Sequence, residues 1–119
     1  MAEQEYTERF TPGHDVTFAV GDDVRAGRVV EVTGNRQIAE TSGASAKVAG
    51  VAAEDRKAGG DVVVKHGKWH DLIASGAITA GDRVASAAGG TVATATQNTI
   101  GLAIEGAADG ATALIRLDQ

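Results

Sequence analysis

Apolar and polar residues alternate along much of the chain in short runs that glycine-rich turns separate. From Val16 to Val20 every second residue is a large apolar one, which is the period of a strand with one buried face. Further apolar or β-branched runs follow at roughly 8–12-residue spacing, which is typical of small all-β folds. These runs are residues 24–32, 36–40, 47–53, 62–64, 90–96, 99–105 and 111–117. We therefore predict an all-β chain, a small β-barrel or sandwich of short strands with Gly-rich turns.

No segment carries the long apolar stripe of an amphipathic helix, and the best short helical candidate is Trp69–Ser75. Three turns share the order Gly-Asp followed by Val, beginning at Gly21, Gly60 and Gly81. Glycine permits positive φ there, and aspartate bonds to its own backbone. Because the spacings between these turns are unequal, we interpret them as repeated turn chemistry and not as a solenoid repeat.

The first 14 residues lack a sustained period and end at the chain's single proline, in the pair Pro12-Gly13. We predict an extended N-terminal arm over residues 1–14 and a single β-rich domain over residues 15–119. The arm carries Tyr6 and Phe10, and aromatic side chains are enriched at the cores of protein interfaces. Two readings stay open: these rings contact a partner, or they fold back onto their own domain.

Composition limits the kind of core that the chain can build. The 119 residues include 16 Gly and no Cys, and only 3% are aromatic. Without cysteine there is no disulfide framework, thiolate zinc site or cysteine nucleophile. A core of Val, Ile, Leu and Ala buries less area per residue than aromatic side chains do. We expect such a core to draw stability from oligomerisation or from a partner.

Charge is divided unevenly along the chain. The net charge of −5 argues against nucleic-acid binding, which needs a basic face, and no apolar run is long enough for a membrane span. Residues 1–23 hold six acids against one base, whereas residues 24–70 hold eight bases against five acids. An acidic head and a basic middle can pair within a chain or between neighbouring chains, or both can lie in solvated loops.

Candidate chemistry is sparse. His66 and His70 have a metal-compatible spacing of four residues, but Gly67 lies between them and no third ligand is evident. The carboxylate pairs Asp22/Asp23 and Glu54/Asp55 sit at turns, where aspartate is common for local reasons. No serine lies in a G-x-S-x-G elbow. We predict no catalytic, cofactor-binding or metal-binding residues, and no enzyme activity.

About the last two-thirds of the chain, and more loosely residues 13–33, carry a resemblance to a known family. The residues that carry it are GAITAGDRV (76–84), AGGTV (88–92), IGLAIE (100–105) and ALIRL (113–117). In this order they resemble the small capsid decoration, or cement, proteins of tailed bacteriophages, particularly those of actinobacterial phages. The resemblance implies an all-β module, usually a homotrimer, made in the host cytoplasm and placed on the outer capsid surface, where it locks neighbouring major capsid proteins together.

This role needs no cofactor, nucleic acid or membrane, and it directs attention to the four aromatic residues. We predict that Tyr6, Phe10, Phe18 and Trp69 bind the partner, with the N-terminal segment acting as a strap over a capsid subunit. The alternative is a small β-barrel module that binds a small ligand or carbohydrate, with Trp69 as its stacking platform.

Overall fold

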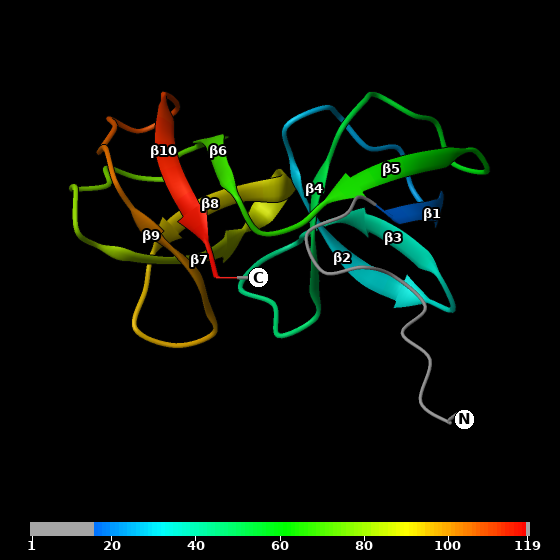
Figure 1. Cartoon of the computed structure of the whole chain (residues 1–119), viewed down its shortest axis with the longest axis horizontal. Coiled ribbons are helices and arrows are strands. Elements are labelled where there is room, and N and C mark those ends of the chain that lie inside the picture. The colour runs from blue at the N-terminus through cyan, green and yellow to red at the C-terminus, as the bar shows by residue number, and fades with distance from the viewer. Residues whose placement is uncertain (1–15, 119) are drawn as a thin grey trace, which may run out of the picture.

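The computed structural model describes residues 16–118, which form two five-stranded units side by side (Figure 1). The N-terminal barrel contains β1 (Val16–Val20), β2 (Val29–Gly34), β3 (Gln37–Glu40), β4 (Val48–Ala52) and β5 (Asp61–Lys65). The C-terminal sheet contains β6 (Trp69–Ile73), β7 (Arg83–Ala87), β8 (Thr91–Thr94), β9 (Thr99–Ala103) and β10 (Thr112–Leu117), with one 3₁₀ turn, η1 (Ala88–Gly90), before β8. The all-β prediction is confirmed, and the predicted arm over residues 1–14 lies outside the described residues.

The two units have the same strand order. The barrel runs β1-β3-β2-β4-β5, and β5 pairs with β1 to close it. The sheet, taken from β8, runs β8-β7-β9-β10-β6, which is the barrel's order β3-β2-β4-β5-β1 strand for strand. A single parallel bridge, Ala74 to Val92, stands where Val20 pairs in parallel with Ile38 in the barrel. The fold is therefore a tandem repeat of one five-stranded unit.

Backbone hydrogen bonds show the same repeat residue by residue. The Gly27 N–H donates to the Ala52 carbonyl at 2.9 Å, and the Gly81 N–H, 54 positions further on, donates to the Ala103 carbonyl at 2.7 Å. The second turn of each unit is bonded in the same way. Its bonds run from Gly59 to Val20 (2.8 Å) and from Gly110 to Ala74 (2.9 Å). All four turn glycines have φ between 77° and 95°, a region that disfavours side chains with a Cβ.

The cores of the two units match position by position. The barrel core consists of Val20, Val24, Val30, Ile38, Ala52, Val62 and Val64. The equivalent residues of the sheet are Ala74, Ile78, Val84, Val92, Ala103, Ala113 and Ile115, all buried in one cluster. That cluster also includes Val29 and Val51 of the barrel, so the sheet packs on the outer side of β2 and β4.

The connection between β3 and β4 ties the two units together. It is three residues longer than its counterpart between β8 and β9. Within it, the Gly43 carbonyl accepts from the Ser86 hydroxyl at 2.8 Å, and the Ser86 Oγ in turn accepts from the Ser45 N–H at 3.0 Å. At its start, the Thr41 hydroxyl donates to the Ala87 carbonyl at 2.8 Å. These bonds satisfy the polar groups that the junction buries, as burial requires.

Two local predictions were wrong. Trp69–Ser75 is not helical: β6 pairs with β10 over five residues, and this strand pairing overrides the weak helical pattern. The predicted strand over residues 24–32 begins only at Val29, because residues 25–28 form a turn that an Arg28 N–H to Arg25 carbonyl bond closes at 3.2 Å.

Candidate functional site

The predicted partner-binding aromatics do not gather into one cluster. Trp69 begins β6 and is 56% exposed, whereas Phe18 lies on β1 and packs against the barrel core. Tyr6 and Phe10 lie outside the described residues. Trp69 and Phe18 therefore define two separate surfaces, one on each unit.

The surface around Trp69 is a row of side chains across four strands. Trp69 is paired with Arg116 on β10, and Arg116 with Leu102 on β9. Leu102 is in turn paired with Arg83 on β7, which forms an ion pair with Asp118. An exposed indole beside guanidinium groups and a leucine is the composition found at protein interfaces. This row can contact a protein surface.

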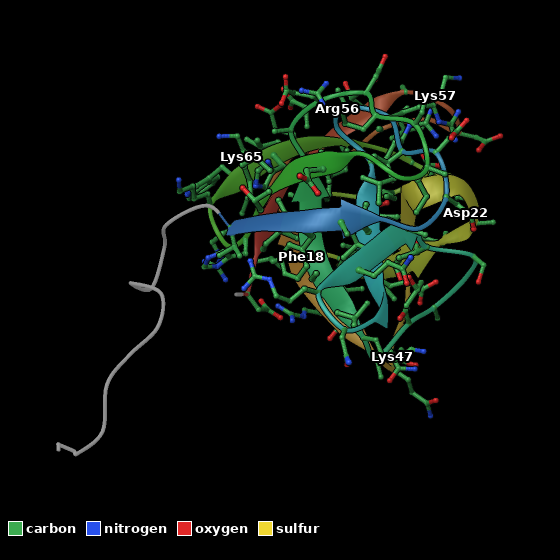
Figure 2. All side chains as sticks on the ribbon, turned by 90° about the vertical axis from the view of Figure 1, so that its right-hand side faces the viewer. Phe18, Asp22, Lys47, Arg56, Lys57 and Lys65 are labelled. Carbon is green, nitrogen blue, oxygen red and sulfur yellow. The ribbon has the colours of Figure 1, made fainter. Side chains whose placement is uncertain are left out.

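The surface around Phe18 lies on the first part of β1. Figure 2 shows Lys65, the last residue of β5, near the end of the barrel where β1 begins. The Arg36 guanidinium lies 5.9 Å from the centre of the Phe18 ring, within cation–π range. Arg36 also donates to the Thr17 carbonyl at 2.8 Å. Val32, 37% exposed, contributes a second apolar side chain at this end of the barrel.

A cavity of about 550 Å³ lies at the opposite end of the barrel, between its two paired turns. Its lining residues are Asp23, Val24, Arg25, Asp55, Arg56 and Lys57, and Figure 2 shows Arg56, Lys57 and the neighbouring Asp22 around this end. The turns cross-link each other: Asp55 accepts from the Ala26 N–H at 2.7 Å, and Asp23 accepts from the Ala58 N–H at 2.8 Å.

The charges of this cavity are engaged with one another. Arg25 donates two bonds to the Glu40 carboxylate, at 2.9 and 2.8 Å, and these bonds raise the pKa of Arg25. The Ala58 N–H, followed by Lys57, lowers the pKa of Asp23 below its ordinary value of 3.8. In the C-terminal sheet the positions of Arg25, Arg56 and Lys57 hold Thr79, Ala107 and Ala108. The charges therefore belong to the barrel alone and are not required by the fold.

The Asp23 carboxylate gives a prediction for stability against pH. Because its pKa is lowered in the folded chain, its contribution to stability is present above pH 3.8 and is lost as the pH falls through the folded pKa. We expect Asp23→Ala to lower the urea midpoint slightly at pH 7 and to leave it unchanged near pH 2. Asp22→Ala, at the adjacent exposed position, is the control. A deficit that persists at pH 2 would show that the carboxylate charge is not its source.

The other residues that the sequence analysis singled out take part in local structural contacts. His70 Nε2 lies 3.0 Å from the Gly67 carbonyl, and within residues 16–118 no three His, Cys, Asp or Glu side chains are grouped to hold a metal ion. Ser45 and Ser86 belong to the junction between the units. In the described part of the chain no helix is long and apolar enough to cross a membrane.

The tandem repeat is the feature that sequence reasoning missed. Its signal is the order Ala-Gly at Ala26-Gly27, Ala58-Gly59 and Ala80-Gly81, which marks the true turn positions. The Gly-Asp pattern pointed instead to Gly21, which lies six residues before the equivalent turn glycine, Gly27. Aligning Ala26-Gly27 with Ala80-Gly81 gives the 54-residue offset, but Ala-Gly also occurs at Ala49-Gly50 and Ala88-Gly89, so the pair alone does not identify the repeat.

Comparisons with known proteins identify the class to which this arrangement belongs. The crystal structure of the head fiber gp8.5 N base in bacteriophage phi29 superposes with a TM-score of 0.68 at 20% identity, covering 88% of this chain and 93% of that chain. This likeness establishes a shared fold. No curated protein sequence matches the chain.

A family model described as phage cement protein matches residues 10–118. The chain belongs to this family, as its turn and strand motifs predicted, and it is a structural protein of the phage head.

Proposed function

We propose that the chain is a capsid cement protein that binds the outer surface of a phage head and stabilises contacts between neighbouring major capsid proteins, without catalytic activity. The family match over residues 10–118 is the observation that carries this proposal. The fold supports it, because two rigid five-stranded units with a sealed junction add interface area without needing a reactive site.

The exposed aromatic side chains are the proposed anchors. Trp69 projects from the start of β6 beside Arg116, and Trp and Arg are the residue types that most often dominate binding energy at interfaces. Tyr6 and Phe10 add two further anchors on a strap formed by the N-terminal segment. Phe18 marks where that strap joins the barrel.

A homotrimer would suit this role. A capsid presents its subunits in fixed geometry, so three linked copies gain avidity that exceeds the affinity of any single contact. Light scattering on the purified chain tests the assembly. A trimer that sediments with phage heads supports the proposal, whereas a monomer whose melting temperature rises with a small ligand supports a ligand-binding module instead.

Occupancy of phage heads measures the proposed anchors directly. We expect Trp69→Ser, and separately a deletion of residues 2–12, each to weaken binding to heads that lack this protein by about tenfold or more, since losing one anchor costs at least about 1.4 kcal/mol. Co-sedimentation over a range of protein concentrations gives the affinity.

Gln97→Ala, an exposed change in the connection between β8 and β9, is the matched control. If both variants bound phage heads as tightly as Gln97→Ala does, the anchor assignment would be refuted. If the unaltered chain did not bind, capsid binding itself would be refuted.

A further inference from the structure

The two units present equivalent ends to their surroundings, and only one of these ends is covered by the described residues. We define the basal end of a unit as the end where its first strand begins and its last strand ends. At this end of the C-terminal sheet lie Ser86, Gly90 and Leu117, and Leu72 lies further along β6, paired with Ala113; all four are buried. Leu72 and Leu117 share one buried cluster with Val29 and Val51 of the barrel. The barrel thus closes the basal end of the sheet with valine side chains.

At the equivalent positions the basal end of the barrel has two apolar side chains, an arginine and a histidine. Phe18, Val32, Arg36 and His66 occupy the positions of Leu72, Ser86, Gly90 and Leu117. Leu72 is fully buried, whereas Phe18 remains partly exposed and Val32 is 37% exposed. The C-terminal sheet therefore shows how a basal end is covered in this fold: apolar side chains of the neighbouring unit pack against it.

We propose that the segment Tyr6–Phe10 of the same chain covers the basal end of the barrel in the free protein. Val16 is paired with Val64 at this end, so the chain that precedes β1 leaves the barrel at the rim of the uncovered surface. Phe10 lies six residues before Val16, a reach of about 20 Å when extended. Pro12-Gly13 lies between them, and Pro-Gly favours the tight turn that would direct the aromatic pair back across Phe18.

Charge supports this occupant. Residues 1–15 hold four carboxylates, from Glu3, Glu5, Glu8 and Asp15, against one arginine. The rim of the basal end holds Arg36 on one side and Lys65 followed by His66 on the other. The aromatic pair of Tyr6–Phe10 therefore matches the apolar seat, and the carboxylates that flank it, Glu3, Glu5 and Asp15, match the cationic rim.

A second copy is the weaker occupant. By analogy with the junction, it would present the outer side of β7 and β9, where Arg83 and Leu102 replace Val29 and Val51. That arrangement would bring Arg83 towards Arg36, and like charges brought together at an interface oppose association.

The segment then has two positions, and only the second rests on the proposed function. In the free protein it lies on its own barrel, and on a phage head it serves as the strap. Release of the strap would also uncover Phe18 and Val32, which adds an apolar surface at the moment of capsid binding.

A spin label placed on the segment tests its position in the free chain, without any capsid. The chain has no cysteine, so Thr7→Cys gives a single attachment site for a nitroxide between Tyr6 and Phe10. We expect the label to broaden the backbone amide resonances of Phe18, Val32 and Arg36 in the isotope-labelled chain. The same label on a chain carrying Tyr6→Ser and Phe10→Ser should leave them sharp. A label at Ala108→Cys, in an exposed turn of the C-terminal sheet, controls for random encounters.

Each other outcome overturns the proposal. Sharp amide resonances at the basal end at low ionic strength would show that the segment does not bind there. Broadening that survives the double serine change would show that the aromatic rings do not hold the segment. A mixture of isotope-labelled chains with separately spin-labelled chains tests the same-chain assignment, since broadening confined to that mixture would identify a second copy as the occupant.

Discussion

Gly50→Ala is expected to lower the free energy of unfolding by about 3 kcal/mol or more, because Gly50 combines a strained backbone with a close approach of two strands. Its φ is 150°, in the region that side chains with a Cβ rarely adopt. A Cβ built there would lie 2.2 Å from the Lys65 carbonyl oxygen and 2.9 Å from Val64 Cγ1. The carbonyl belongs to β5, paired with β4 at this point, so relief requires the barrel strands to separate.

Urea denaturation measures this loss, and the chain supplies a matched control. Gly43→Ala places a Cβ in open space, with nothing within 4 Å, and is expected to change stability by a few tenths of a kcal/mol at most. Equal losses for the two variants would mean that β4 and β5 are not as close as the structure shows. Gly101 repeats the arrangement in the C-terminal sheet, where a Cβ would lie 2.7 Å from the Arg116 carbonyl oxygen.

Local pattern was enough to predict most of the strands. Alternation marked β1 without error, and the Val-rich run at residues 62–64 identified β5 to within one residue at each end. β6 was mistaken for a helix because Trp69, Leu72 and Ile73 have helical spacing as well. The strand is decided by its pairing with β10, whose paired residues lie about 40 positions away and outside any local window.

The tandem repeat was beyond local pattern because the two units share shape more than sequence. Val20 matches Ala74, and Ile38 matches Val92, so the common property is apolar character rather than identity. The three extra residues between β3 and β4 also shift the offset from 54 to 51. The backbone hydrogen bonds of the turn glycines establish which residues of the two units are equivalent.

The candidate site was predictable only as a set of residue types. Scarce aromatics in a Gly-rich chain indicated Phe18 and Trp69, and the structure leaves Trp69 exposed. Their separation onto two units depends on the repeat, which the sequence reasoning did not find. The same holds for Asp23 and Asp55, whose bonds to Ala58 and Ala26 join turns about 30 residues apart.

The repeat also shows how the outer sides of the two units differ. Val29 and Val51 form the apolar side on which the C-terminal sheet packs. The equivalent positions of that sheet hold Arg83 and Leu102, and Arg83 is tied to Asp118. A charged group at the centre of this face makes the packing of another unit against it costly.

The junction between the units gives the second large effect. Gly89 and Gly90 both have φ of 71°, so alanine at either position pays the same left-handed strain of about 1 kcal/mol. They differ in surroundings: a Cβ on Gly89 would lie 3.6 Å from its nearest neighbour, whereas one on Gly90 would lie 2.7 Å from Arg28 Cβ and 2.9 Å from the Val29 carbonyl oxygen. We expect Gly90→Ala to cost about 2 kcal/mol more than Gly89→Ala, because only Gly90→Ala forces the two units apart.

Two optical signals distinguish an opened junction from general destabilisation. Trp69 is the only tryptophan and reports on the C-terminal sheet, whereas far-ultraviolet circular dichroism reports on the strands of both units. In the unaltered chain and in Gly89→Ala the two urea transitions are expected to coincide, because the shared cluster couples the units into one cooperative transition. In Gly90→Ala they should separate, since Val29 and Val51 no longer seal the basal end of the sheet. Coincident transitions with equal midpoints for both variants would contradict this, and would mean that the two units fold as one body without needing close contact at Gly90.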